Sequence, residues 1–167
     1  MKNFVFDDSQ YTLRALVPAD ERKLQEFFYS HNKETLMMRY NHHTKQMTRE
    51  KSCTLVSVNQ HKDLALCFTE KHQLSEVIQA VARYYLDENS NTAEMAFVIK
   101  ESKRGQGMAS VLLTEVIAIA KLRGVNSLIA CVRKDNSSML KVFEKNNFVR
   151  INNTSSHEID LQLNLNQ

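Results

Sequence analysis

Glycine, proline and tryptophan are scarce in this sequence, which has three glycines, one proline and no tryptophan among 167 residues. Flexible linkers and low-complexity segments are rich in glycine and proline, so the scarcity of both argues against such segments. A chain of this length can bury a core that needs no metal or disulfide to hold it together. The sequence therefore predicts a single domain over residues 1–167.

Long hydrophobic runs and a large excess of one charge are also absent. The chain reaches Asp7 and Asp8 before any apolar run long enough for a signal peptide, and no later run approaches the length of a membrane span. The net charge of +3 results from 22 basic and 19 acidic residues that are spread along the chain. This balance gives no case for a nucleic-acid or membrane partner. We expect a cytoplasmic protein that binds neither.

Cysteine occurs at three positions, Cys53, Cys67 and Cys131, which are far apart and form no C-x-x-C pair. An odd number of separated cysteines predicts neither a disulfide framework nor a zinc site, and reduced thiols are typical of the cytoplasm. The six histidines form no H-E-x-x-H motif, so we expect no metal. Cys131 lies in the apolar stretch SLIACV, where it is predicted to be a small buried strand residue.

Hydrophobic periodicity divides the chain into strands and helices that surround one sheet, which predicts an α/β (α+β) fold. The strongest helix is predicted from Met108 to Arg123, with Gly124 after it, where many helices end on glycine. Residues 47–58 are ambiguous, because their apolar residues fit a strand as well as a helix. The other predicted elements are strands at 11–17, 63–69, 77–86, 92–100, 127–132 and 157–165, and helices at 18–30 and 137–147.

Two of the three glycines, Gly105 and Gly107, lie one residue apart in the stretch KRGQGMAS (103–110). Glycine is favoured where the backbone takes a positive φ or where something approaches it closely. A strand, a charged turn and two glycines that open a long helix point backbone N–H groups and a helix dipole at an anion. A phosphate or diphosphate is the ligand that this arrangement favours.

Two common phosphate-binding motifs do not fit this stretch. A Walker A loop requires a Lys-Ser/Thr pair after its second glycine, and none is present. A Rossmann fingerprint requires glycines directly after the strand, and a glycine or alanine at the position of Ser110. Here five polar residues, 100–104, separate the strand from the first glycine.

The segment Arg104-x-x-Gly107-x-Ala109 resembles the diphosphate-binding motif Arg/Gln-x-x-Gly-x-Gly/Ala of the GNAT superfamily of N-acetyltransferases. Residues 93–149 look like the core of that family, and most of residues 11–149 are similar to the acetyltransferase domain of Pat-type bacterial protein lysine acetyltransferases. The resemblance implies a GNAT fold, with one mixed and mostly antiparallel central sheet flanked by helices. It also implies that residues 47–58 form a helix.

The same resemblance implies an enzyme that transfers an acetyl group from acetyl-CoA to a primary amine by direct attack in a ternary complex. An amine such as lysine has a pKa of about 10.4, so a base must remove a proton before the attack at neutral pH. In the family this base is the glutamate of the Ala-Glu-x-Ala-Phe stretch, which is Glu94 here. The residues implied to bind acetyl-CoA are Phe97, Val98, Ile99, Arg104, Gly105, Gln106, Gly107, Met108, Ala109, Ser110 and Asn136.

The proton donor for the departing thiolate is left open by the sequence. Many relatives use a tyrosine of the last helix, where this sequence has Phe143, and phenylalanine has no proton to donate. Water, another tyrosine such as Tyr84 or Tyr85, or unaided departure of the thiolate are the alternatives. The charged ends of Lys103 and Arg104 either contact the phosphates or form a solvated charge run.

The acceptor and the oligomeric state are also left open. The Pat-type resemblance implies a protein lysine, and a small amine or an antibiotic is the alternative. A module that binds acetyl-CoA for sensing or interaction, without turnover, is the rival to an enzyme. Arg39 and Tyr40 lie in the acceptor-side region of the family and are either acceptor contacts or structural residues. The alternating strand at 157–165 is expected at a sheet edge, where pairing with a second copy would turn a monomer into a homodimer.

Overall fold

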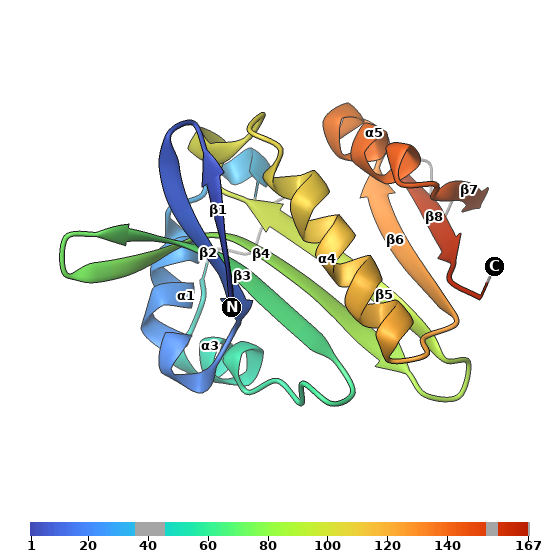
Figure 1. The fold of residues 1–167 in the computed structure, drawn as a ribbon, viewed down its shortest axis with the longest axis horizontal. Coiled ribbons are helices and arrows are strands. Elements are labelled where there is room, and N and C mark those ends of the chain that lie inside the picture. The colour runs from blue at the N-terminus through green and yellow to red at the C-terminus, as the bar shows by residue number, and fades with distance from the viewer. Residues whose placement is uncertain (36–45, 153–156, 167) are drawn as a thin grey trace.

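A single sheet organises the protein in the computed structural model, which describes residues 1–35, 46–152 and 157–166 (Figure 1). Within these residues the sheet has eight strands in the order β1-β2-β3-β4-β5-β6-β8-β7. All neighbouring strands are antiparallel except β5 and β6, so the predicted mixed and mostly antiparallel sheet is confirmed. The strands are β1 (Lys2–Phe6), β2 (Ser9–Ala15), β3 (Leu64–His72), β4 (Ser75–Asp87), β5 (Thr92–Ile99), β6 (Ser127–Arg133), β7 (Val149–Asn152) and β8 (Glu158–Asn164).

Helices cover both faces of the sheet, and each face has its own hydrophobic core. Leu112 of α4 and Phe143 of α5 belong to the larger core. Phe27 of α1 and Val56 of α3 belong to the smaller core on the opposite face. The predicted sheet flanked by helices is therefore confirmed. The helices are α1 (Glu21–Tyr29), α3 (Arg49–Val56), α4 (Met108–Leu122) and α5 (Ser137–Lys145).

The crossover helix α4 connects the parallel strands β5 and β6, which cannot be joined by a tight turn. Its sequence determines both ends. Gly107 is the N-cap with a φ of +90°, and Gly124 follows the C-cap residue Arg123 with a φ of +71°. Both conformations favour glycine, and they set the helix between two sharp changes of chain direction.

The sheet opens between β5 and β6. Their parallel pairing runs from Thr92 opposite Ser127 to Met95 opposite Ala130 and then stops. Both strands continue beyond this point, β5 to Ile99 and β6 to Arg133. The backbone groups of β5 that face β6 are therefore without a strand partner over its last residues, and space for a ligand lies at this opening.

Most of the ambiguous stretch 47–58 forms a helix, as the family resemblance implies, with bounds Arg49–Val56. The helix α3 begins after Thr48, whose side chain accepts a hydrogen bond from the backbone N–H of Lys51 at 3.2 Å. Ser52 and Val56, four residues apart, are its buried residues. The apolar alternation in this stretch is also compatible with a strand, and the N-cap together with packing on α1 decides in favour of the helix.

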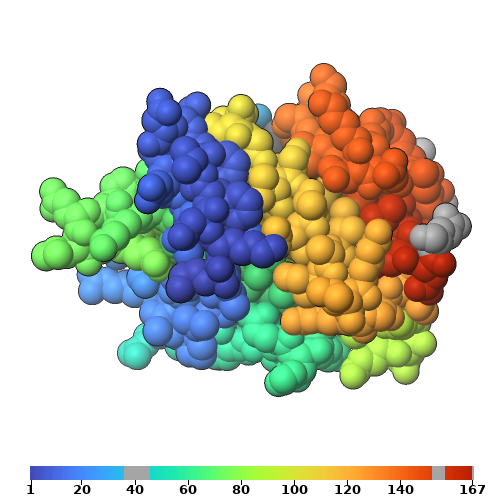
Figure 2. Space-filling view, in the orientation of Figure 1, coloured from blue at the N-terminus to red at the C-terminus, as the bar shows by residue number. Residues whose placement is uncertain are grey.

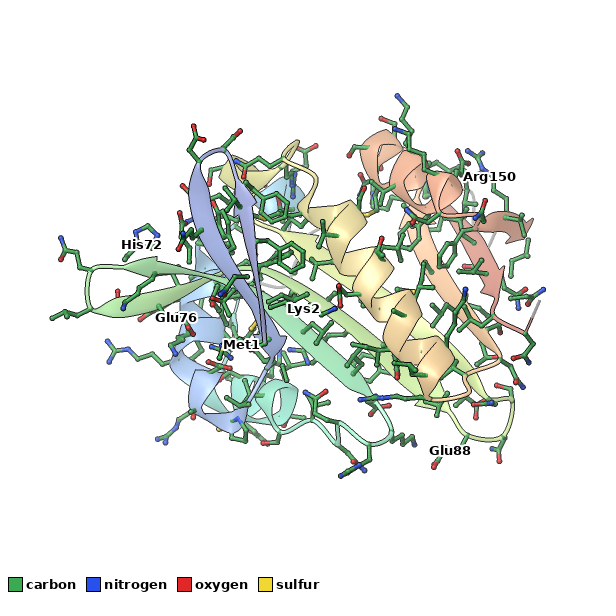
Figure 3. All side chains as sticks on the ribbon, viewed as in Figure 1. Met1, Lys2, His72, Glu76, Glu88 and Arg150 are labelled. Atoms are coloured by element: carbon green, nitrogen blue, oxygen red, sulfur yellow. The ribbon has the colours of Figure 1, made fainter. Side chains whose placement is uncertain are left out.

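Two strands, β1 and β7, are not among those that the sequence predicts. The turn before β2 uses Asp7 and Asp8, which have φ values of 44° and 61° and replace the glycines that usually mark such a turn. The N-terminal segment lies against α4 (Figure 2). Lys2 there reaches Glu115 of α4, with Nζ and Oε2 2.7 Å apart (Figure 3).

Two expectations about the C-terminal part of the sheet are wrong. The strand β8 pairs with β6 on one side and β7 on the other, so it is not an edge and cannot provide the expected edge pairing. Cys131 is exposed rather than buried. Side chains alternate between the faces of a strand, and Ala130 and Val132 take the places in the core beneath α4 and α5. Cys131 points to the opposite face.

Candidate active site

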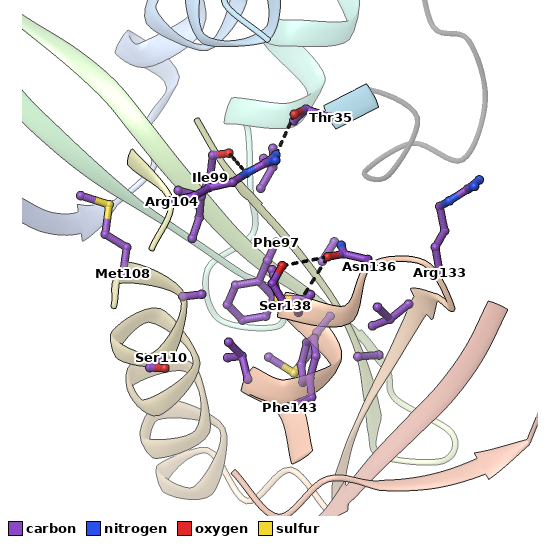
Figure 4. Close-up of a pocket in the computed structure, with 18 of the residues that line it drawn as sticks. Thr35, Phe97, Ile99, Arg104, Met108, Ser110, Arg133, Asn136, Ser138 and Phe143 are labelled. Atoms are coloured by element: carbon purple, nitrogen blue, oxygen red, sulfur yellow. Dashed lines mark hydrogen bonds between the residues drawn. The ribbon is translucent and has the colours of Figure 1, made fainter. Parts of the chain in front are cut away.

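A cavity of about 460 Å³ lies where β5 and β6 separate (Figure 4). Residues of β5, β6, the loop before α4 and the first turns of α4 and α5 line it. Glu94 is among them, and so is every residue predicted to bind acetyl-CoA except Gln106. The predicted binding residues that line the cavity are Phe97, Val98, Ile99, Arg104, Gly105, Gly107, Met108, Ala109, Ser110 and Asn136.

The glycine loop, residues 104–107, presents its backbone to this cavity. Gly105 and Gly107 have φ values of +76° and +90°, in the left-handed region that favours glycine. The backbone N–H groups from Gly105 to Ser110 have no hydrogen-bond acceptor among the described residues. They lie at the N-terminus of α4, where the helix dipole adds partial positive charge. This arrangement is suited to an anion.

The two cations before the glycines are engaged by the protein. Lys103 Nζ donates to Tyr11 OH at 2.9 Å and forms an ion pair with Glu70 Oε2 at 3.0 Å. Burial alone lowers the pKa of Lys103, but these two partners outweigh it and raise the pKa. Arg104 donates from Nη2 to Thr35 Oγ1 at 2.7 Å and from Nε to the carbonyl of Ile99 at 3.3 Å (Figure 4). Lys103 is half-buried, whereas Arg104 is exposed although its guanidinium is hydrogen-bonded.

Glu94 is the third residue of β5 and is exposed at the wall of the cavity. Its carboxylate has no hydrogen-bond or ion-pair partner among the described residues. In the sheet it lies between Tyr85 of β4 and Ile129 of β6. Glu158 of β8 lines the same cavity. Glu94 is therefore free to accept a proton from a molecule bound in the cavity.

Comparison with known families identifies the family of this chain. A model of the acetyltransferase (GNAT) domain matches residues 10–149. The chain belongs to this GNAT family. The predicted family is therefore confirmed.

Solved GNAT structures share the fold at low sequence identity. The GNAT domain of PAT from S. lividans is 20% identical, with a TM-score of 0.86 over 98% of this chain and 96% of that one. The phosphinothricin acetyltransferase of Sinorhizobium meliloti, in complex with AcCoA, is 15% identical, with a TM-score of 0.73 over 92% of this chain and 88% of that one. The predicted GNAT fold is confirmed.

A shorter match concerns sequence alone. The protein named "Putative phosphinothricin acetyltransferase YwnH" of Bacillus subtilis (strain 168) is 42% identical over 59 residues. This match covers 35% of the GNAT chain and 36% of the length of YwnH. The chain thus spans about a third of that relative, and the matched part supports the family rather than a particular substrate.

Asn136 caps a helix and also lies in the wall of the cavity. It is the N-cap of α5, where its Oδ1 accepts from the backbone N–H of Met139 at 3.4 Å and from Ser138 Oγ at 3.3 Å (Figure 4). Its Nδ2 has no acceptor among the described residues and is left to donate to a ligand, because Asn136 lines the cavity. Capping of α5 fixes the side chain in this orientation.

Neither candidate tyrosine lines the GNAT cavity. Tyr84 is fully buried, and its hydroxyl accepts a hydrogen bond from Arg123 Nη1 at 2.9 Å. Tyr85 is 46% exposed on the strand next to β5. Phe143 does line the cavity, with its ring edge-on to Phe97 at 5.7 Å between centroids. Among the described residues, the lining of the cavity thus holds no tyrosine to protonate a thiolate.

One residue of the cavity has no signal in the sequence, and one predicted binding residue lies outside the cavity lining. Thr35 lines the cavity although no motif surrounds it. Gln106 does not line it, and its buried Oε1 has no hydrogen-bond partner among the described residues. Arg39 and Tyr40 lie outside the described residues.

In the described ranges, no group of three or more His, Cys, Asp or Glu side chains could hold a metal ion. No helix in these ranges is long and apolar enough to cross a membrane.

The carboxyl group of Glu101, just before the glycine loop, predicts a pH dependence of stability. Burial raises its pKa, but hydrogen bonds from the Thr35 side chain and the Asn32 backbone N–H outweigh this and lower the pKa from 4.5 to about 2. The ionised carboxylate therefore stabilises the fold above pH 4.5 by roughly 3 kcal/mol, and this contribution is lost as the pH falls from 4.5 toward 2.

The measurement is urea unfolding of wild type and the variant Glu101→Gln. At pH 6 we expect the variant to be less stable by the full contribution. At pH 3 the difference in unfolding free energy falls to about half. At that pH the carboxyl is mostly protonated in the unfolded chain but still mostly ionised in the folded protein. An equal difference at the two pH values would contradict this assignment.

Proposed function

We propose that the protein is an acetyl-CoA-dependent N-acetyltransferase that acts on a primary amine by direct attack in a ternary complex. The observation that carries this proposal is the row of unpaired N–H groups at the glycine loop, which opens into a cavity that extends to the unpaired carboxylate of Glu94. Membership in the GNAT family supports it. The proposal needs no metal.

Coenzyme A is the anion that fits this cavity. Its diphosphate would accept hydrogen bonds from the backbone of residues 105–110, at the positive end of α4. Its pantetheine arm carries amides, and these would pair with the backbone of Phe97, Val98 and Ile99, beyond the end of the β5–β6 pairing. The amide nitrogen of Asn136 would donate from the opposite wall.

Glu94 and the unpaired end of β5 would carry out the acetyl transfer. Glu94 takes a proton from the acceptor ammonium, directly or through water, and the neutral amine attacks the thioester carbonyl. A backbone N–H of β5 stabilises the oxyanion of the tetrahedral intermediate. The intermediate expels the thiolate of coenzyme A, and the nitrogen, which still carries one proton more than an amide, passes that proton to the thiolate through water or to the solvent. Departure without an acid is feasible, because a thiol has a pKa of about 8.5.

The acceptor is an amine of a protein lysine or of a small molecule. Structural similarity to the GNAT domain of PAT supports the protein lysine. The name of YwnH supports a small molecule. We propose the protein lysine first, because the similarity to the PAT domain extends over nearly the whole chain, whereas the match to YwnH covers 35% of it.

One observation favours a second function, an acetyl-CoA sensor without turnover. Phe143 is 2% exposed and packs against Phe97 and Phe148 where a proton donor would serve catalysis. A cavity that binds the coenzyme without helping the thiolate to leave would suit a sensor. The unpaired carboxylate of Glu94 favours the enzyme.

The proposal extends to organisation and location. We propose one domain over residues 1–167, because the described strands all belong to one sheet. A cytoplasmic location agrees with a cytoplasmic supply of acetyl-CoA. The protein is a monomer or a homodimer, and the outer strands available for pairing between copies are β1 and β7.

Calorimetric titration with acetyl-CoA tests the proposal, with NAD and ATP as controls. We expect micromolar binding of acetyl-CoA alone. Release of coenzyme A is then followed with lysine peptides, polyamines and aminoglycosides as acceptors. Binding together with release supports the enzyme, whereas binding without release by any acceptor supports the sensor. Absence of binding contradicts both functions.

A further inference from the structure

A buried threonine connects the glycine loop to the segment that follows α1. Thr35 is 1% exposed and lines the cavity. Its Oγ1 accepts a hydrogen bond of 2.7 Å from Nη2 of Arg104, the residue directly before Gly105 (Figure 4). The contact spans 69 residues of sequence, so it is made only in the folded protein.

Glu101 completes this connection. Its Oε1 accepts from the backbone N–H of Asn32 at 2.7 Å, and its Oε2 lies 3.6 Å from Nδ1 of His31. The Thr35 side chain also helps to lower the pKa of the Glu101 carboxyl. Thr35 thus lies between the guanidinium of Arg104, from which its hydroxyl accepts, and the carboxyl of Glu101. His31 is buried, and this burial lowers its pKa.

The guanidinium of Arg104 is held at one side only. Its Nε donates to the carbonyl of Ile99 and its Nη2 to Thr35. A guanidinium has five donors, and the others have no acceptor among the described residues. They lie at the wall of the cavity beside the unpaired backbone N–H groups of the glycine loop. A guanidinium fixed in this way needs no rearrangement to bind a phosphate oxygen.

We propose that Thr35 and Glu101 are positioning residues for the diphosphate of the coenzyme, which hold Arg104 and the glycine loop in the binding geometry. This inference rests on the proposed function. It states that binding of the diphosphate depends on two residues that connect the glycine loop to the segment after α1. Neither residue has to touch the coenzyme. The ion pair of Lys103 with Glu70 holds the residue directly before Arg104.

The test compares Thr35→Val, which keeps the shape and removes the hydroxyl, with Thr35→Ser, which keeps the hydroxyl. Calorimetry gives the affinity for coenzyme A, and an NMR titration gives the affinity for pantetheine, which lacks the diphosphate. We expect Thr35→Val to weaken coenzyme A by about tenfold or more, because a hydrogen bond to a charged group is lost. Thr35→Ser should bind within about threefold of wild type. Neither variant should change the affinity for pantetheine.

The matched control is Thr69→Val, since Thr69 is 2% exposed and lies in β3, outside the cavity lining. We expect it to bind both ligands as wild type does. Wild-type affinity of Thr35→Val for coenzyme A would overturn the inference and leave the proposed function intact. An equal loss for coenzyme A and pantetheine would also overturn it, because a general structural effect would then explain the loss. Wild-type protein that binds no coenzyme A would overturn both proposals.

A second variant covers the case in which Thr35→Val does not fold. Glu101→Gln keeps the shape of the side chain and removes the charge that fixes the Thr35 hydroxyl. We expect about tenfold weaker binding of coenzyme A with unchanged binding of pantetheine. Retained affinity for coenzyme A in this variant would contradict the positioning role.

Discussion

Replacement of Gly107 by glutamate is expected to abolish acetyl-CoA binding while the protein remains folded. The φ of +90° at this position strains any residue with a Cβ, at a cost of about 1–2 kcal/mol. No atom lies within 4 Å of an added Cβ, so the side chain does not clash with the protein. It instead extends into open space beside the N–H groups of the loop. Its negative charge there repels the diphosphate, and we expect more than about 100-fold weaker binding.

The matched control is Gly124→Glu at the other end of α4. Gly124 has a φ of +71° and open space around it, so the same substitution introduces a similar strain far from the loop. We expect this variant to bind acetyl-CoA as wild type does in calorimetry, with a comparable loss of thermal stability. If Gly107→Glu binds with wild-type affinity, the glycine loop is not the diphosphate site. If both variants lose binding, strain rather than ligand contact explains the loss.

The parts of the fold that the sequence predicts are those with local chemical signals. The ends of α4 follow from Gly107 and Gly124, which are two of only three glycines in the chain. The start of α5 follows from Asn136, whose side chain caps the helix. Each signal acts through a backbone conformation or a single hydrogen bond near its own residue. Local chemistry of this kind can be identified in a sequence without knowledge of the fold.

The parts that the sequence does not predict depend on contacts between distant segments. β7 has only four residues and pairs with β8, so its short pattern carries little information. Cys131 is exposed because no described helix covers its face of β6, although the stretch around it is apolar. Thr35 meets Arg104 across 69 residues. Such facts follow from the arrangement of the sheet and its helices, which periodicity alone does not determine.

The sequence likewise predicts one part of the binding site and not the other. The glycines, Arg104 and Asn136 are found from the motif, and the structure brings them to one cavity. The motif does not say where the charged ends of Lys103 and Arg104 lie. Each is engaged by an oxygen from a distant part of the chain, Glu70 and Thr35 respectively. In the proposed complex the backbone of the loop would therefore be the main donor surface for the diphosphate, together with the remaining donors of Arg104.

Replacement of Glu94 by glutamine is expected to lower the rate of acetyl transfer by about 10²–10³-fold, because the variant keeps the shape of the base but cannot accept a proton. Affinity for acetyl-CoA should remain at the wild-type value, since Glu94 lies near the start of β5 and the unpaired N–H groups lie beyond its end. The measurements are release of coenzyme A in the steady state and calorimetric titration of the same preparation. An unchanged rate would remove Glu94 from the mechanism.

Two comparisons separate a base from a group that only binds the acceptor. Glu158→Gln alters another carboxylate of the same cavity and should change the rate by no more than a few-fold; a large loss in this variant alone would move the role to Glu158. An acceptor amine with a pKa below 7 arrives mostly neutral at pH 7 and needs no base. With this acceptor the defect of Glu94→Gln should nearly disappear if Glu94 removes the proton. A defect of the same size with both amines would mean that Glu94 orients the acceptor, because that role does not depend on its protonation.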